Sequence, residues 1–139
     1  MSQENVEIVR RAWELVFPDG ADPAPGAVFD HGLYAPTFIG NPPAELVGLR
    51  TYVGRAGFVE WLRSFGENFD DWRAWPEQII DAGGDHVVTV VRQTARGWGS
   101  GVTVEERFSF LYTLKDGQVV RQDTYRDPAG AARAVGLEE

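Results

Sequence analysis

The sequence contains no cysteine, so disulfide bonds and thiolate metal sites are both excluded. It also lacks an apolar run of about 18 residues and a basic-then-apolar segment after Met1, the signals of a membrane-spanning helix and of a secretory leader. Basic residues are outnumbered 13 to 21 by acidic ones, and a net charge of −8 argues against nucleic acid and anionic membrane as partners. We therefore expect a cytoplasmic protein that binds neither.

Histidine is scarce as well, with two residues in the chain. His31 follows Asp30 near a loop, and His86 follows Asp85 at a turn. Neither pair supplies the three or four ligands that a metal ion needs. We expect no metal site and no cofactor.

The 139 residues fit a single domain, residues 1–139, that is long enough to bury a core without disulfides or metals. Apolar residues at helical spacing predict a helix from the start of the chain to about residue 17 and a second from about 55 to 68. Four predicted strands follow, at 72–82, 86–96, 103–114 and 118–126. The segment after Asp127-Pro128 then predicts a closing helix. Helices followed by an antiparallel meander indicate an α+β fold.

Residues 103–114 carry the clearest strand pattern, because every second side chain is large and apolar or aromatic. One face of this strand is formed by Val104, Glu106, Phe108, Phe110, Tyr112 and Leu114. A bulky aromatic face that carries one carboxylate is what a cupped sheet would show where it lines a pocket for a small molecule. We expect burial among aromatic side chains to raise the pKa of Glu106, as suits a general base.

The turn at residues 115–117 leaves two registers open for the last hairpin. A three-residue loop would pair Phe110 with Gln122 and would place Val120, Gln122, Thr124 and Arg126 on the aromatic face. A two-residue Asp-Gly turn would exchange the two faces of the last strand. We favour the three-residue loop because it brings Val120 into the interior.

Apolar matching suggests a register for the preceding hairpin. It places Val88 opposite Phe110 and, by the same register, Arg92 opposite Glu106. A buried arginine facing a carboxylate satisfies both charges and could also hold a polar group of a ligand. In an enzyme, Glu106 would be the base, and Arg92 and Tyr112 would orient the substrate or stabilise an oxyanion.

Aromatic residues of the helices and polar residues of the last strand complete the predicted pocket. Its expected ligand-binding residues are Trp13, Phe17, Tyr34, Trp61, Phe65, Trp75, Phe108, Phe110, Gln122 and Thr124. An aromatic stripe at helical spacing is also what an ordinary core would show. Where a cupped sheet lines a pocket, core and pocket wall are formed by the same side chains.

Three segments resemble the SnoaL-like proteins of the nuclear transport factor 2-like superfamily. They are MSQENVEIVRRAWELV at the start of the chain, YVGRAGFVEWLRSFGENFDDW in the middle and GSGVTVEERFSFLYTLKDGQVVRQDTYRDPAGAARAVGL near its end. The resemblance implies a curved antiparallel sheet wrapped into a cone around three to four helices, a pocket inside, and a homodimer formed through the outer face of the sheet. Members include polyketide cyclases, steroid isomerases, dehydratases, epoxide hydrolases and binding domains.

The chain departs from the catalytic patterns of the enzymes that this resemblance implies as relatives. The histidine and aspartate of the polyketide cyclases correspond to Phe110 and Thr124, neither of which can transfer a proton at neutral pH. The tyrosine that the isomerases carry on their first helix is replaced by Trp13. The Asp-Arg-Asp set of the epoxide hydrolases is matched only in part, by Arg92 and Glu106.

Two functions are consistent with the sequence. The first is a protein that encloses a small, largely apolar ligand, with or without cofactor-free acid/base chemistry of the isomerase, cyclase, dehydratase or hydrolase type. The second is a noncatalytic ligand-binding or dimerisation domain in which Arg92 and Glu106 form a structural pair.

Overall fold

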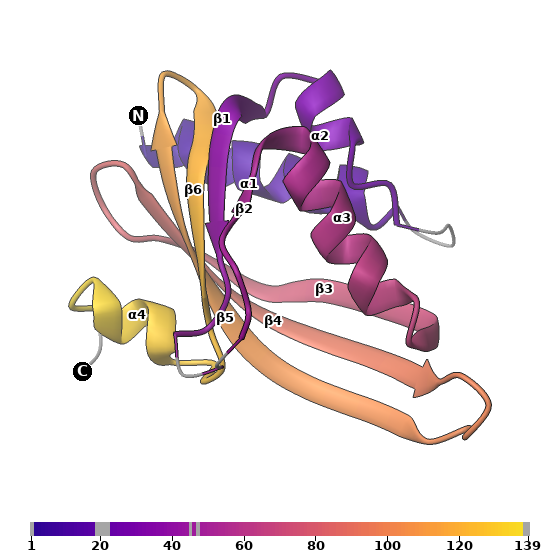
Figure 1. The fold of residues 1–139 in the computed structure, drawn as a ribbon. Coiled ribbons are helices and arrows are strands. Elements are labelled where there is room, and N and C mark those ends of the chain that lie inside the picture. Colours follow the sequence, from indigo (N-terminus) through magenta and orange to yellow (C-terminus); the bar gives the residue numbers. More distant parts are fainter. Residues whose placement is uncertain (1, 19–22, 45, 47, 138–139) are drawn as a thin grey trace.

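The computed structural model describes residues 2–18, 23–44, 46 and 48–137, which form four helices and six strands (Figure 1). In chain order they are α1 (Ser2–Val16), α2 (Ala27–Asp30), β1 (Tyr34–Asn41), β2 (Tyr52–Val53), α3 (Gly54–Gly66), β3 (Phe69–Asp81), β4 (His86–Gly97), β5 (Thr103–Lys115), β6 (Gln118–Tyr125) and α4 (Gly130–Ala134). None of these helices is long and apolar enough to cross a membrane.

One mixed sheet runs through the molecule in the order β2-β1-β6-β5-β4-β3. The expected meander from β3 to β6 is confirmed, with every neighbouring pair antiparallel. β1 extends the sheet by pairing parallel to β6, and the two-residue strand β2 pairs antiparallel to β1. The predicted α+β class is therefore confirmed.

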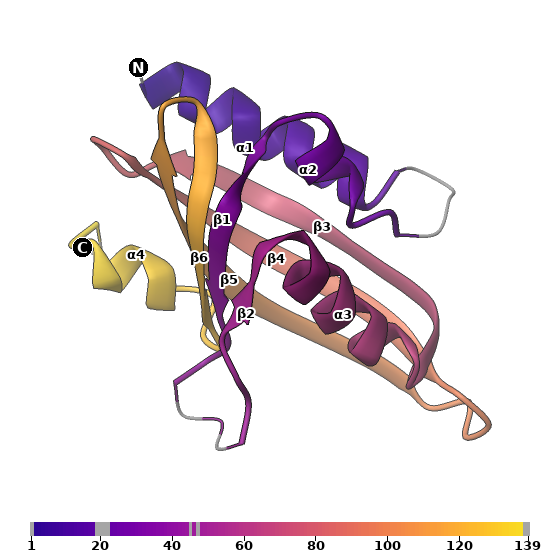
Figure 2. The ribbon, with the colours of Figure 1, turned by 45° about the horizontal axis from the view of Figure 1, so that its top comes forward.

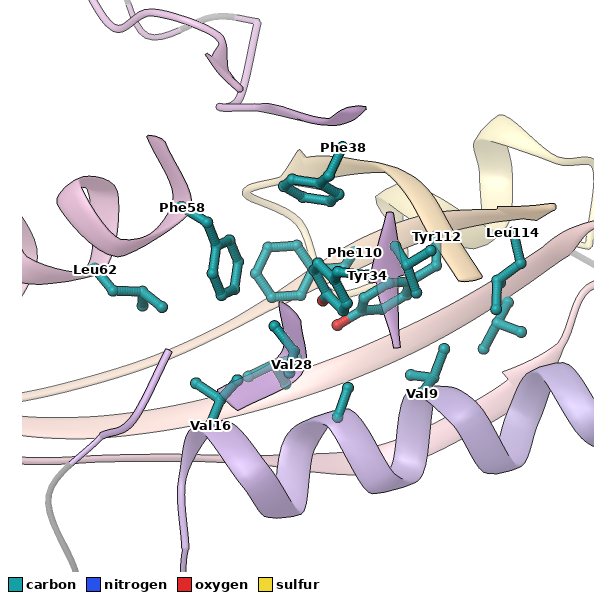
Figure 3. Packing of buried hydrophobic residues seen from close by; sticks show 14 of the residues in the cluster. Val9, Val16, Val28, Tyr34, Phe38, Phe58, Leu62, Phe110, Tyr112 and Leu114 are labelled. Atoms are coloured by element: carbon teal, nitrogen blue, oxygen red, sulfur yellow. The ribbon is translucent and has the colours of Figure 1, made fainter. Parts of the chain in front are cut away.

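The sheet bends strongly, and α1 and α3 lie on its inner face, whereas the short α4 lies on its outer face (Figures 1 and 2). Val9, Ala12 and Val16 form the buried stripe of α1, and Phe58 and Leu62 form that of α3. Figure 3 shows Val9 and Val16 of α1 pointing toward the aromatic side chains of the sheet. A second, smaller core lies beneath α4 on the outer face.

The register of β4 and β5 differs by one residue from the prediction. Glu106 pairs with Gln93, and Arg92 pairs with Arg107. The inner face of β4 is therefore formed by its odd-numbered residues, and Val88 is buried instead on the outer face, in the core beneath α4. Apolar residues occur on both faces of this strand, so apolar matching could not distinguish the two registers.

In the β5–β6 hairpin, Gln122 and Thr124 lie on the predicted face of the sheet, but the turn differs from the predicted one. Lys115 pairs with Gln118, so the turn has two residues, Asp116 and Gly117, both with positive φ (53° and 80°) as a type I′ turn requires. The predicted three-residue loop is wrong. A bulge between Thr113 and Leu114 shifts the pairing by one residue, so that Phe110 faces Thr124 and Tyr112 faces Gln122. Gln122 and Thr124 thus lie on the inner face, as expected.

Candidate functional site

A cavity of about 460 Å³ lies between the inner face of the sheet and the helices α1 and α3. Its size falls in the range of small-molecule sites in proteins. Its walls are mainly aromatic and aliphatic. The lining residues are Ala12, Trp13, Val16, Phe17, Tyr34, Pro43, Leu46, Phe58, Trp61, Leu62, Phe65, Trp72, Ala74, Gln93, Glu106, Arg107, Phe108, Phe110, Tyr112, Gln122, Thr124 and Arg126.

Most of the site residues predicted from the sequence line the cavity, and two of them lie outside it. Those that line the cavity are Trp13, Phe17, Tyr34, Trp61, Phe65, Glu106, Phe108, Phe110, Tyr112, Gln122 and Thr124. Two do not line it. Arg92 forms an ion pair with Glu105. Trp75 is 39% exposed, and the Arg92 guanidinium lies over its ring, with Cζ 5.9 Å from the ring centroid.

Arg92 lies on the outer face because its register places it opposite Arg107 rather than Glu106. The predicted Arg92–Glu106 pair is therefore wrong. Glu106 is exposed at the edge of the cavity, so the expectation that it is buried among aromatic side chains is wrong as well.

The cavity has a closed end, formed by the buried Tyr34, Tyr112 and Gln122. The Tyr34 hydroxyl donates a hydrogen bond of 2.7 Å to Gln122 Oε1. The Gln122 amide nitrogen makes no hydrogen bond to a described residue, so it can donate to a ligand. The hydroxyl groups of Tyr52 and Thr124 lie buried beside each other nearby, and neither makes a well-formed hydrogen bond with a described residue.

Burial controls the chemistry of the tyrosines at this end. It raises the pKa of Tyr112, an effect partly offset by the neighbouring polar groups of Thr89 and Trp13. Trp13 donates from Nε1 to the Tyr112 hydroxyl oxygen at 3.0 Å. Burial also raises the pKa of Tyr34, with further contributions from Tyr112 and Tyr52. Both phenols therefore stay protonated at neutral pH and can donate hydrogen bonds.

The other end of the cavity, its mouth, is formed by the exposed residues Glu106, Arg107 and Arg126. Glu106 accepts a hydrogen bond of 2.9 Å from Gln93 Nε2. Gln93 in turn accepts one of 3.2 Å from Trp72 Nε1, which can only donate. The indole therefore fixes the orientation of the Gln93 amide, and the amide holds the carboxylate at the mouth.

Glu106 and Tyr112 are too far apart to act on one reacting group. They are six residues apart on the same face of β5, which corresponds to about 20 Å of strand. The closed end can thus donate hydrogen bonds, whereas the carboxylate at the mouth is the group that can accept a proton. Among the described residues, no three acidic or histidine side chains come together to hold a metal ion.

Sequence reasoning missed three cavity-lining residues at or near the mouth, Trp72, Gln93 and Arg107. Trp72 was predicted to begin a strand, but its side chain was not assigned to either face of the sheet. The one-residue error in the register of β4 and β5 placed Gln93 on the outer face. Arg126 was expected on the aromatic face with Gln122 and Thr124 but was not named as a ligand-binding residue, and it lines the cavity.

A sequence profile of the SnoaL-like domain matches residues 24–122. The chain belongs to the SnoaL-like domain family. No curated protein matches it in sequence.

Solved structures show how widely the fold of this SnoaL-like protein is shared. A protein of Jannaschia sp. CCS1, proposed to be a SnoaL-like polyketide cyclase, is 23% identical, with a TM-score of 0.74 and coverage of 99% of this chain and 94% of that one. A hypothetical protein of Catenulispora acidiphila DSM 44928 with a ketosteroid isomerase-like fold, in complex with trimethylamine, is 16% identical, with a TM-score of 0.67 and coverage of 95% of this chain and 94% of that one. TerC, co-crystallised with polyporic acid, is 22% identical, with a TM-score of 0.64 and coverage of 95% and 98%.

The cone-shaped fold expected from the family resemblance is therefore confirmed. Phe110 and Thr124, the two residues that the family resemblance sets against the cyclase histidine and aspartate, face each other across β5 and β6. Both line the cavity.

Proposed function

We propose that this SnoaL-like protein binds a flat, mainly aromatic small molecule that places an oxygen acceptor at the closed end of the cavity. The observation that carries the proposal is the amide nitrogen of Gln122, which has no acceptor among the described residues, in a cavity with mainly aromatic and aliphatic walls. A ligand oxygen at this end would accept a hydrogen bond from the amide nitrogen while the rings of the ligand bury apolar surface.

The shape of the walls supports a flat ligand. Tyr52 and Trp61 stack with ring centroids 4.5 Å apart and an interplanar angle of 8°, which presents a planar surface on the α3 side. Phe108 and Phe110 pack edge to face on β5. The complexes of related folds with trimethylamine and polyporic acid support the proposal that such cavities accept small molecules.

Cofactor-free proton transfer is a second candidate function, favoured by the way Gln93 holds Glu106. A carboxylate with one oxygen fixed by an amide and the other free is suited to act as a general base on the part of a ligand that lies at the mouth. In this reading, Tyr112 would bind the opposite end of the ligand rather than the reacting group.

A matched pair of probes tests the binding function. 4-Acetylbiphenyl carries a ketone oxygen that 4-ethylbiphenyl lacks, and the two have nearly the same shape. We expect the ketone to bind more tightly, by about three- to tenfold, as one buried hydrogen bond implies, and Gln122→Met to remove the preference. Isothermal titration calorimetry measures both affinities. Failure of both probes to bind the folded protein would refute the proposal.

We also propose that the protein forms a homodimer through the outer face of its sheet. Trp75 is exposed on this face among the ion pairs Arg92–Glu105 and Arg107–Glu77, a mixture of aromatic and charged side chains typical of interfaces. Analytical ultracentrifugation should show a dimer that Trp75→Glu dissociates. A monomeric wild-type protein would refute this arrangement.

A further inference from the structure

Arg126 occupies a special place at the mouth of the cavity. Tyr125, the last residue of β6, pairs with Ser109, so the next residue of the chain comes to lie beside Phe108 on the inner face. Arg126 lines the cavity and is exposed, so its guanidinium is accessible to a ligand that extends out of the mouth.

Two arginines line the cavity, and Arg107 is paired with Glu77 whereas Arg126 has no acidic partner among the described residues. Nine of the arginines form ion pairs with aspartate or glutamate side chains. Arg126 has no such partner among the residues that the structure describes, although the chain carries a net charge of −8 and acids are plentiful. The acid of the cavity wall, Glu106, is bound to Gln93 instead.

We propose that the ligand of this cavity carries an acidic group, such as a carboxylate, that Arg126 binds at the mouth while Gln122 binds an oxygen at the closed end. Gln122 and Arg126 are four residues apart on the same side of one strand, about 13 Å along the chain. A ligand with two aromatic rings in line and a polar group at each end is about as long as this separation. A guanidinium recognises a carboxylate through paired hydrogen bonds as well as through charge. This inference rests on the binding function proposed above.

Two probes with the same rings isolate the acidic group. 4′-Acetylbiphenyl-4-carboxylate carries the negative charge, and 4′-acetylbiphenyl-4-carboxamide is its neutral counterpart. We expect Arg126→Gln to weaken binding of the carboxylate by about three- to tenfold and to leave binding of the carboxamide unchanged. Arg11→Gln makes the same change of charge at an exposed position of α1 outside the cavity, so it should affect neither probe.

Salt and a second variant give independent readouts. Added salt should weaken binding of the carboxylate to the wild-type protein more than to Arg126→Gln, because it screens the ion pair at the exposed mouth. Glu106→Gln should strengthen carboxylate binding by removing a like charge from the mouth.

The outcomes separate this inference from the binding function. If the carboxamide binds and Arg126→Gln weakens both probes equally, or neither, the acidic-ligand inference is refuted and the binding function stands. If neither probe binds and 4-acetylbiphenyl also fails to bind, the binding function itself is refuted.

Discussion

Replacing Gly40 with alanine should destabilise the wall of the cavity. A Cβ atom at this position would lie 2.0 Å from Tyr52 Cε2 and 2.2 Å from Tyr52 Cζ. Carbon atoms in contact prefer about 3.5–4.0 Å, so the Tyr52 ring would have to move by about 1.5 Å. Trp61, stacked on the other side of that ring, blocks a simple shift. Overpacking of this kind typically lowers the free energy of unfolding by about 1–3 kcal/mol. Because the new Cβ would clash with two atoms of a ring that Trp61 holds in place, we expect Gly40→Ala to cost about 3 kcal/mol.

Urea denaturation of Gly40→Ala beside a matched glycine variant measures this cost. At Gly66, near the end of α3, an added Cβ would come no closer than 3.7 Å to the Trp72 ring, and Gly66→Ala should be neutral or stabilising by up to about 1 kcal/mol. Combining Gly40→Ala with Tyr52→Leu should cost less than the sum of the two single changes, since the smaller side chain relieves the clash. Equal stability of Gly40→Ala and Gly66→Ala would refute the reasoning.

Three further predictions concern buried polar groups. Trp13→Phe removes the donor to the Tyr112 hydroxyl and should lower the free energy of unfolding by about 1–2 kcal/mol, whereas Trp98→Phe, at a 65% exposed side chain, should have little effect in the same denaturation assay. Burial raises the pKa of Tyr112, so the stability that its protonated phenol contributes is fully present below about pH 10 and is lost as the pH rises above that value. In Tyr112→Phe, the free energy of unfolding should therefore fall less steeply with pH above about 10, by up to about 1.4 kcal/mol per pH unit. Denaturation at a series of alkaline pH values measures this difference. Ser109→Ala removes the hydroxyl that accepts the Ala131 amide proton at 3.0 Å and should cost about 1–2 kcal/mol, and hydrogen exchange of that amide should accelerate; unchanged exchange would contradict the role given to Ser109.

The elements with a strong and simple period were predictable from the sequence. The apolar spacing around Phe58 and Leu62 predicted α3 to within two residues of its observed ends, because one face of this helix is buried and the other is exposed. The alternation in β5 likewise identified the wall that carries Phe108 and Phe110. In both elements the pattern has one apolar side, and burial on that side determines the structure.

The register of β4 could not be predicted because the strand is apolar on both faces. Val87 and Val91 face the cavity side, whereas Val88 is buried beneath α4. A helix of five residues, distant in sequence, thus supplies the second buried face. The error moved Arg92 into the predicted site and Gln93 out of it.

The β5–β6 hairpin shows two errors that cancel. The turn is shorter by one residue than predicted, and the bulge next to Thr113 restores the alternation. Gln122 therefore lies on the predicted face although its cross-strand partner is Tyr112 and not Phe110. A bulge depends on packing across the whole sheet, and the local pattern carries no sign of it. The two-residue strand β2 is likewise too short to show a period.

The most direct test of the binding function is a crystal structure of the protein with 4-acetylbiphenyl. The account predicts the two rings between Trp13, Trp61 and Phe110, with the ketone oxygen within hydrogen-bonding distance of the Gln122 amide nitrogen. A cavity filled by the side chains of Trp61 and Phe65, with the probe absent or bound on the surface, would contradict it.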